Sequence, residues 1–281
     1  MDAIEIKGLC KSYSGFTLSD INLNVPQGTI MGLVGENGAG KSTTLRLIMN
    51  AIARDAGSVS VLGVDNQSAG FNTLKQEIGV VLDEAYFPEV LTAGDVGKVM
   101  AGTYKNWDEA YYERCLARFS LPEKKIFKEF SRGMKMKLSI AVALSHSPRL
   151  LILDEATSGL DPMMRDEILE IFNDFTRDET HSILLSSHIV SDLEKICDYI
   201  AFIHRGRLLL CKEKDRLLEE YGVLRITRDK YMDIPPEAVM GKRSTPYGVE
   251  VLVEKSAVSS AFGAERTTLE DIILFLAKGE R

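Results

Sequence analysis

The first 210 residues of the chain switch repeatedly between two hydrophobic patterns. Residues 4–9 and 18–25 alternate apolar and polar side chains, which is typical of half-buried antiparallel strands. A turn at 205–207 predicts a hairpin that continues into 208–210. Continuous apolar runs that end in polar or turn residues predict buried strands at 29–34, 79–82, 150–153, 182–185 and 199–203.

Segments with helical spacing of their apolar residues lie between these strands. They predict helices at 41–53, 94–104, 108–119, 132–145, 162–177 and 189–197. Regular alternation of strands and helices implies a mostly parallel sheet that is covered on both faces. The long helical stretch at about 94–147 is then an insertion between two strands of that sheet.

The pattern changes after about residue 212. A short helix ends over 217–221, strands are expected at 223–227 and 249–253, and 267–277 is a capped amphipathic helix. These elements predict a small α+β appendage at 213–281, next to a larger unit at 1–212. The expected fold class is α/β, with antiparallel N-terminal strands, a mostly parallel core sheet, a helical insertion and this appendage.

Composition excludes two classes of protein. Hydrophobic residues make up 45% and charged residues 27% of the 281 residues, which excludes a mainly disordered chain. The longest stretch without a charged side chain, 21–35, is shorter than the roughly 18 apolar residues of a membrane-spanning helix. A net charge of −7 argues against a general nucleic-acid binder, so no nucleic-acid partner is expected.

Two further features favour a cytoplasmic location. The four cysteines form no CxxC pair and are expected to be free thiols in a reducing compartment. Asp2 and Glu5 lie in the first six residues, and no apolar core of a secretory signal follows them.

Residues 35–42 match the phosphate-loop pattern G-x-x-x-x-G-K-[ST] at every fixed position. The loop follows an apolar run and precedes a predicted helix, so its backbone N–H groups and the helix N-terminus would surround an anion. The Lys41 ammonium is expected to reach the β- and γ-phosphates, and the Ser42 hydroxyl is expected to ligate Mg²⁺. The nucleotide-binding residues predicted in this loop are Gly35, Asn37, Gly38, Ala39, Gly40, Lys41 and Ser42.

Two carboxylates, Asp154 and Glu155, follow the apolar run 150–153. Ligands of open α/β sheets bind beyond the carboxyl ends of the strands, so both side chains should face the nucleotide. Asp154 is expected to hold Mg²⁺, directly or through water, and Glu155 to act on water as a general base. Solvated acids at the end of a strand are the structural alternative.

Three other residues allow a functional and a structural interpretation. Ser131, followed by Gly133, begins a helix and is either a second phosphate-binding device or a simple N-cap. His188 ends a strand and either donates to a γ-phosphate oxygen or is structural. Tyr13 follows the first strand and either stacks on adenine or packs a hairpin.

Together these motifs resemble the ATP-binding cassette (ABC) ATPases. The phosphate loop, the segment 130–135, the Asp154–Glu155 pair, Asp161 and His188 occur in the order and spacing of that family over about residues 1–212. The Ser-Arg-Gly-Met-Lys sequence at 131–135 and the tail at 267–272 resemble, more narrowly, the ATPase subunits of bacterial ABC-2-type exporters of the bacitracin-resistance group.

The resemblance implies a role for each matching residue. Tyr13 would stack on adenine, Thr43 would join the phosphate loop, and Glu155, His188 and Lys41 would form the catalytic set. Ser131 and Gly133 match signature positions that contact the γ-phosphate bound to another subunit. Two ATP molecules would then lie between two ATPase chains in a head-to-tail homo- or heterodimer, with Asp161 in the loop between subunits.

The same resemblance implies a cytoplasmic ATPase that is peripheral on the inner face of the membrane and drives a separate permease chain. ATP and Mg²⁺ are the expected cofactors. An importer subunit is one alternative. A non-transport ABC ATPase that works on DNA or ribosomes is another, although the coiled-coil insertions or second cassette common in that class are not visible.

Two positions depart from the family pattern. Arg132 stands where a glycine commonly follows the signature serine, with Met134 where glutamine is frequent. Asp83 stands where a glutamine normally touches Mg²⁺ and couples to the membrane subunit. A carboxylate can also ligate Mg²⁺, so Asp83 is predicted as a metal ligand with Ser42 and Asp154.

Overall fold

A computed structural model describes residues 1–84, 87–259 and 262–278 of the chain. Its centre is a six-stranded sheet in which five strands run parallel and the edge strand β10 pairs antiparallel with β9. From one edge to the other the strands are β10 (Arg207–Glu213), β9 (Tyr199–His204), β3 (Ile30–Val34), β8 (Ser182–Ser187), β7 (Leu150–Asp154) and β6 (Ile78–Val81). The predicted parallel core sheet is therefore confirmed.

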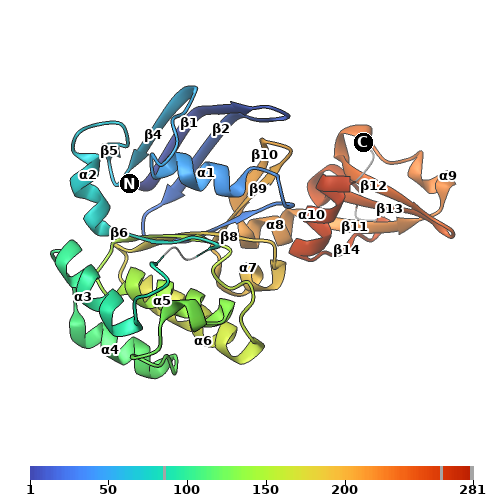
Figure 1. Ribbon diagram of the computed structural model, residues 1–281. Coiled ribbons are helices and arrows are strands. Elements are labelled where there is room, and N and C mark those ends of the chain that lie inside the picture. The colour runs from blue at the N-terminus through green and yellow to red at the C-terminus, as the bar shows by residue number, and fades with distance from the viewer. Residues whose placement is uncertain (85–86, 260–261, 279–281) are drawn as a thin grey trace.

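A second, antiparallel sheet lies above the central sheet, with helix α1 (Lys41–Ile48) between the two (Figure 1). Its strand order is β2-β1-β4-β5, and the half-buried pattern of β1 and β2 reflects packing on one face only. The strands are β1 (Asp2–Tyr13), β2 (Phe16–Pro26), β4 (Ala56–Val61) and β5 (Val64–Asp65), followed by α2 (Phe71–Leu74) and a 3₁₀ turn at Lys75–Glu77.

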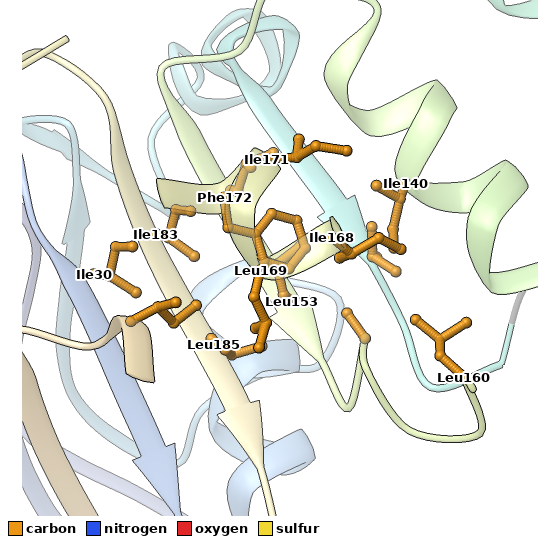
Figure 2. Close-up of a cluster of buried hydrophobic side chains, with 14 of the residues drawn as sticks. Ile30, Ile140, Leu153, Leu160, Ile168, Leu169, Ile171, Phe172, Ile183 and Leu185 are labelled. Carbon is orange, nitrogen blue, oxygen red and sulfur yellow. The ribbon is translucent and has the colours of Figure 1, made fainter. Parts of the chain in front are cut away.

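The opposite face of the central sheet is covered by helices α5 (Arg132–Leu144), α6 (Pro162–Phe175) and α7 (Val190–Ile196). Figure 2 shows Phe172 of α6 among leucines and isoleucines of β7 and β8. Strands β3, β7 and β8 are buried along their whole length, because side chains on both faces meet apolar layers. This explains why they were visible as continuous apolar runs.

The insertion between β6 and β7 contains α3 (Ala93–Thr103), α4 (Glu109–Arg118), a 3₁₀ turn at Phe127–Glu129 and α5. Thr92 and Asp95 form a reciprocal capping box at the start of α3. The buried Tyr112 of α4 packs against Gly97 and donates its hydroxyl to the carbonyl of Ala93 at 2.7 Å. The helices predicted at 94–104, 108–119 and 132–145 are therefore present.

Beyond β10, helix α8 (Lys214–Glu220) leads to a four-stranded antiparallel sheet with the order β12-β13-β11-β14. The sequence patterns predicted β11 (Tyr221–Ile226) and β13 (Gly248–Glu254) but missed β12 (Val239–Thr245), because its glycine, two cations and polar end conceal the strand period. The remaining elements are α9 (Arg228–Tyr231), 3₁₀ turns at Pro236–Ala238 and Lys255–Ala257, β14 (Glu265–Arg266) and α10 (Leu269–Lys278).

Helix α10 is attached to the larger unit. Its residues Leu269 and Ile272 are fully buried in the apolar cluster that covers the central sheet on the side of α5, α6 and α7. The Glu194 carboxylate of α7 accepts a hydrogen bond from the Leu269 N–H at 2.8 Å, and Lys214 of α8 donates to the Glu194 carbonyl at 2.8 Å. Three elements far apart in the sequence are thus joined around Glu194.

Helix α1 is shorter than predicted and ends at Ile48 instead of continuing to residue 53. Asn50 takes a left-handed conformation with φ 51°, and the N–H groups of Asn50 and Ala51 bond back to the carbonyls of Leu47 and Arg46. This 6→1 and 5→2 pattern is a Schellman stop. In the described residues the four cysteines are free, and no helix is long and apolar enough to cross a membrane.

Candidate functional site

The phosphate loop connects β3 to α1 and is shaped by its glycines. Gly38 and Gly40 take left-handed φ angles of 81° and 116°, which only glycine adopts readily. A Cβ on Gly35 would lie 2.3 Å from the carbonyl oxygen of Ile203 in β9. The loop therefore needs glycine at these three positions for conformation or for space, and it leads directly into the helix N-terminus at Lys41.

Lys41 is buried, with 5% of its surface exposed. Its ammonium donates a hydrogen bond to the Gly35 carbonyl at 2.7 Å and approaches the Glu36 carbonyl at 3.5 Å. It also lies 3.3 Å from Oε1 of Glu155. The loop carbonyls and the carboxylate together hold a positive charge at the base of the loop, where a phosphate would enter.

The two predicted carboxylates stand at the end of β7, next to β8. Asp154 is buried and accepts a hydrogen bond from the hydroxyl of Ser186, its partner in the register of the two strands. The Glu155 N–H is 3.1 Å from the carbonyl oxygen and 3.2 Å from Oγ of the same serine. Ser186 was not predicted as a site residue; its only signal is its place at the carboxyl end of a buried strand.

His188 is brought against Glu155, as its place after β8 suggested. Its Nδ1 lies 2.6 Å from Oε2 of Glu155, and its backbone N–H donates to the same oxygen at 3.3 Å. Half of the imidazole surface is exposed. Glu155 has φ 53°, an unusual left-handed conformation for a glutamate, so backbone strain accompanies the side chain's position between Lys41 and His188.

Lys41 and Glu155 border a cavity of about 490 Å³, which Asp154 and His188 do not line. Its lining residues are Gly15, Phe16, Glu36, Asn37, Gly38, Gly40, Lys41, Ser42, Thr43, Asp83 and Glu155. Phe16, at the start of β2, was missed because a single aromatic in a hairpin carries no distinctive pattern. Tyr13 is 46% exposed and is not among the lining residues; the Lys11 ammonium lies 5.5 Å from its ring centroid.

Ser131 and Gly133 lie elsewhere. Ser131 is the N-cap of α5, and its hydroxyl accepts from the Met134 N–H at 3.3 Å. Asp161 caps α6 in the same way, through the Met164 N–H at 3.0 Å. Both caps border a second cavity of about 380 Å³, here called the signature cavity, which shares no lining residue with the phosphate-loop cavity. Within one chain, the two phosphate-binding devices therefore do not meet.

Asp83 and Arg132, the two residues that depart from the family pattern, contact each other. Nη2 of Arg132 donates to Oδ1 of Asp83 at 2.7 Å. Asp83 follows the edge strand β6 and lines the phosphate-loop cavity, whereas Arg132 lines the signature cavity. The guanidinium points to a carboxylate of its own chain, which the sequence alone did not indicate.

Comparisons with known proteins agree with this geometry. The family model described as "ABC transporter" matches residues 18–158. The chain belongs to the ABC transporter family. The lantibiotic transport ATP-binding protein SrtF of Streptococcus pyogenes is 37% identical over 215 residues, which cover 75% of this chain and 91% of SrtF. The bacitracin transport ATP-binding protein BcrA of Enterococcus faecalis is 34% identical, over 73% of this chain and 68% of BcrA.

Solved structures show the same fold. The ATP-binding subunit of an ABC transporter superposes with a TM-score of 0.70 at 31% identity, over 77% of this chain and 92% of that one. A dimeric ATP-binding cassette in a post-hydrolysis state superposes with a TM-score of 0.67 at 20% identity, over 75% and 98%. The predicted ABC fold, the ATPase activity and the exporter-type ATP-binding subunit are confirmed.

The site of this ABC ATPase fits a nucleoside triphosphate. Oε1 of Glu155 is buried, lies 3.3 Å from the Lys41 ammonium and accepts no hydrogen bond within the described residues, so it can accept one from a further group. In the described ranges no three His, Cys, Asp or Glu side chains form a metal cluster. Ser42 and Asp83 line the phosphate-loop cavity, and their side-chain oxygens are the kind of ligand that Mg²⁺ takes beside phosphate and water.

Proposed function

We propose that this ATPase works as a head-to-tail dimer, with itself or with a related chain, and drives a separate membrane permease of an exporter. The observation that carries the proposal is the separation of the two phosphate-binding devices. Lys41 and the phosphate loop border one cavity, and Ser131 and Gly133 border another. A second chain in a two-fold arrangement would bring the signature of each to the phosphate loop of the other.

In this proposal the phosphate loop binds the β- and γ-phosphates of ATP. Backbone N–H groups of the loop and of the first turn of α1, together with the Lys41 ammonium, neutralise the phosphate charge, because Gly38, Gly40, Lys41, Ser42 and Thr43 line the cavity before ATP enters. Tyr13 is exposed next to the turn between β1 and β2, and its ring stacks on adenine. Phe16 adds an aromatic wall to the same cavity.

Glu155 serves as the general base and His188 as its positioning partner. Oε1 of the carboxylate, which faces the Lys41 ammonium, accepts a proton from water, while Oε2 is fixed by the imidazole and backbone N–H of His188. The Lys41 ammonium lies 3.3 Å from the carboxylate and pairs with it before phosphate enters.

Mg²⁺ would be held by Ser42 and Asp154, with Asp83 as a third candidate, and would neutralise charge on the transferred phosphate. Ser42 lines the cavity at the first turn of α1. Asp154 is buried and oriented by Ser186. The orientation of a ligand by a neighbouring hydroxyl is the usual second layer of a metal site.

The remaining proposals concern organisation. Residues 1–212 form the nucleotide-binding unit, with a helical subdomain at about 94–147, and residues 213–281 form an extension. The chain acts in the cytoplasm, on the inner face of the membrane, where the permease lies. The similarity to ATP-binding proteins of lantibiotic and bacitracin transport supports an exporter over an importer.

Glu155→Gln tests the dimer. The amide keeps the side chain's size but accepts no proton, so ATP hydrolysis should fall by about 10²–10⁴-fold while ATP still binds. The closed dimer should then accumulate, because hydrolysis no longer reopens it. Light scattering after size exclusion should show an ATP-dependent dimer for this variant and mostly monomer for the wild type.

Two controls define the result. Glu113→Gln, the same change on an exposed face of α4 outside both cavities, should behave as wild type. Adding Ser131→Arg to Glu155→Gln should abolish the dimer. A Glu155→Gln chain that hydrolyses ATP normally contradicts the role of Glu155. One that binds ATP, is inactive and never dimerises, alone or with a partner ATPase chain, contradicts the dimer.

A further inference from the structure

An ion pair joins the two cavities, which share no lining residue. Asp83 borders the phosphate-loop cavity, Arg132 borders the signature cavity, and both line a third cavity of about 410 Å³ between them. Their side chains meet at 2.7 Å. The loop after β6 is thereby tied to the first turn of α5, which carries Ser131 and Gly133.

The arginine also touches the loop between the two N-caps. A Cβ on Gly159 would lie 3.5 Å from Cδ and 3.6 Å from Nε of Arg132, so the arginine stem fills the space beside this glycine. Arg132 therefore contacts three parts of its own chain: the signature turn that contains it, the Gly159 backbone and Asp83. A residue so placed influences the shape of the signature without needing to touch a nucleotide.

The pair is weak enough to be broken. The side chains of Arg132 and Asp83 are 61% and 48% exposed, and exposed ion pairs contribute little stability. Asp83 faces the phosphate-loop cavity with Ser42 and Glu155, where a divalent cation and ATP would compete for its carboxylate. Because a divalent cation and the Arg132 guanidinium are both positive and would repel each other at the same carboxylate, cation binding and the Arg132 contact should oppose each other.

We infer that Asp83 exchanges between Arg132 and the cation of its own nucleotide site, and that Arg132 is a positioning residue of the signature. With the site empty, Asp83 holds Arg132 beside Gly159. With cation and ATP bound, Arg132 is released, and the signature turn that faces the partner's nucleotide changes its mobility. This inference rests on the proposed nucleotide site and adds a link from that site to the signature of the same chain.

A double-mutant cycle tests the exchange. Mn²⁺, which is visible by electron paramagnetic resonance, is titrated into purified chain saturated with ATP, in the Glu155→Gln, Ser131→Arg background that stays monomeric and does not hydrolyse. Arg132→Ala should tighten Mn²⁺ binding by about 1.4- to 5-fold, the range expected for an exposed pair, because Asp83 is no longer held. Asp83→Ala should weaken Mn²⁺ binding, and in that variant Arg132→Ala should have no further effect.

Lys135→Ala is the matched control. Lys135 lines the third cavity from the next turn of α5, and its ammonium lies over the Phe127 ring instead of contacting Asp83. It should leave Mn²⁺ affinity unchanged. An equal gain from Lys135→Ala, or an Arg132→Ala gain that persists without Asp83, would mean a general field effect and would overturn the inference. Arg132→Lys should restore most of the wild-type affinity.

Amide hydrogen exchange measures the mobility of the signature turn, which the inference links to cation binding. Addition of Mg²⁺ and ATP should speed exchange over 132–136 in a chain with Asp83 and Arg132, and should leave it unchanged when either is alanine. Absence of this difference overturns the inference while leaving the nucleotide site intact. Failure of the parent chain to bind ATP and Mn²⁺ at all would instead contradict the proposed function.

Discussion

The phosphate-loop cavity and the signature cavity use the same local chemistry in opposite surroundings. Each is formed by the N-terminus of a helix with small residues nearby, α1 after Gly40 and α5 after Ser131. In the first, Lys41 and Glu155 are almost completely buried and contact each other. In the second, Ser131 and Arg132 are exposed, and the Ser131 hydroxyl caps its own helix through the Met134 N–H.

The difference shows which half of a site is complete within one chain. Buried charges must be paired inside the fold, so the Lys41, Glu155 and His188 network is set by folding alone. The N–H groups of an exposed helix N-terminus can bond to water, so they need no partner within the fold and can bind a ligand from another chain. Variants should therefore affect the two cavities differently, and the expected effects decrease in the order given below.

Lys41→Ala should cause the largest loss. It removes the cation at the phosphates and leaves Glu155 buried beside no ammonium, so ATPase activity should fall by at least ~10²-fold and thermal stability should also fall. Phosphate release and a melting curve measure both. Lys98→Ala, an exposed lysine on α3, is the control. Normal turnover in the Lys41 variant would refute the phosphate-loop assignment.

Two glycine-to-alanine variants, one in the phosphate loop and one in the signature, should differ in their effect on monomer stability and ATP affinity. In Gly35→Ala the new Cβ meets the Ile203 carbonyl at 2.3 Å, so the unfolding free energy should fall by about 1–3 kcal/mol and ATP affinity with it. In Gly133→Ala the nearest atom is 3.4 Å away, so the folded monomer should be at least as stable and bind ATP normally.

The Gly133 variant should fail only at the step that needs two chains. Added to Glu155→Gln, it should weaken the ATP-dependent dimer, because a methyl group narrows the signature cavity. Denaturant titration, ATP titration and light scattering separate these effects. Equal loss of monomer stability in both glycine variants would remove the distinction between the cavities.

Tyr13→Ala should weaken ATP binding by about 1–3 kcal/mol if the exposed ring stacks on adenine. Tyr13→Phe keeps the ring and should bind as wild type. Fluorescence titration with a labelled ATP analogue measures both. Unchanged affinity in the alanine variant would return Tyr13 to a role in the hairpin, with Phe16 as the aromatic side chain that lines the cavity.

The smallest effect should come from His146, which lies outside both cavities. Burial lowers the pKa of His146 below its ordinary 6.5, so the unfolded chain binds this proton at a higher pH than the folded chain. The stability it contributes is complete above pH 6.5 and is lost as the pH falls below it. The melting temperature should therefore fall less between pH 7.5 and pH 5.5 in His146→Gln than in wild type. ATP affinity at pH 7.5 should be equal in both.

The sequence by itself determined the central strands and the phosphate loop. Strands β3, β7 and β8 are apolar along their length because both faces are covered, and such runs need no long-range information to be recognised. The loop at 35–42 is equally local, since its glycines and the following helix create the anion site within a few residues. The order of motifs along the chain then predicted the family.

Only the tertiary structure decided which polar groups share a partner. Ser186 orients Asp154 because β7 and β8 are neighbours in register, although the two residues are 32 positions apart. Strand β12 is recognisable by its pairing with β13 rather than by its own composition. Such contacts depend on how strands are ordered in a sheet, which a linear pattern of residue types does not contain.

The same holds for Asp83 and Arg132. Each looked in the sequence like a separate departure from a family pattern, one at a metal position and the other at a phosphate position. Folding brings the loop after β6 and the start of α5 together, and the two departures become one ion pair. Opposite charges that are 49 residues apart in the sequence can be matched only after the chain has closed the distance between them.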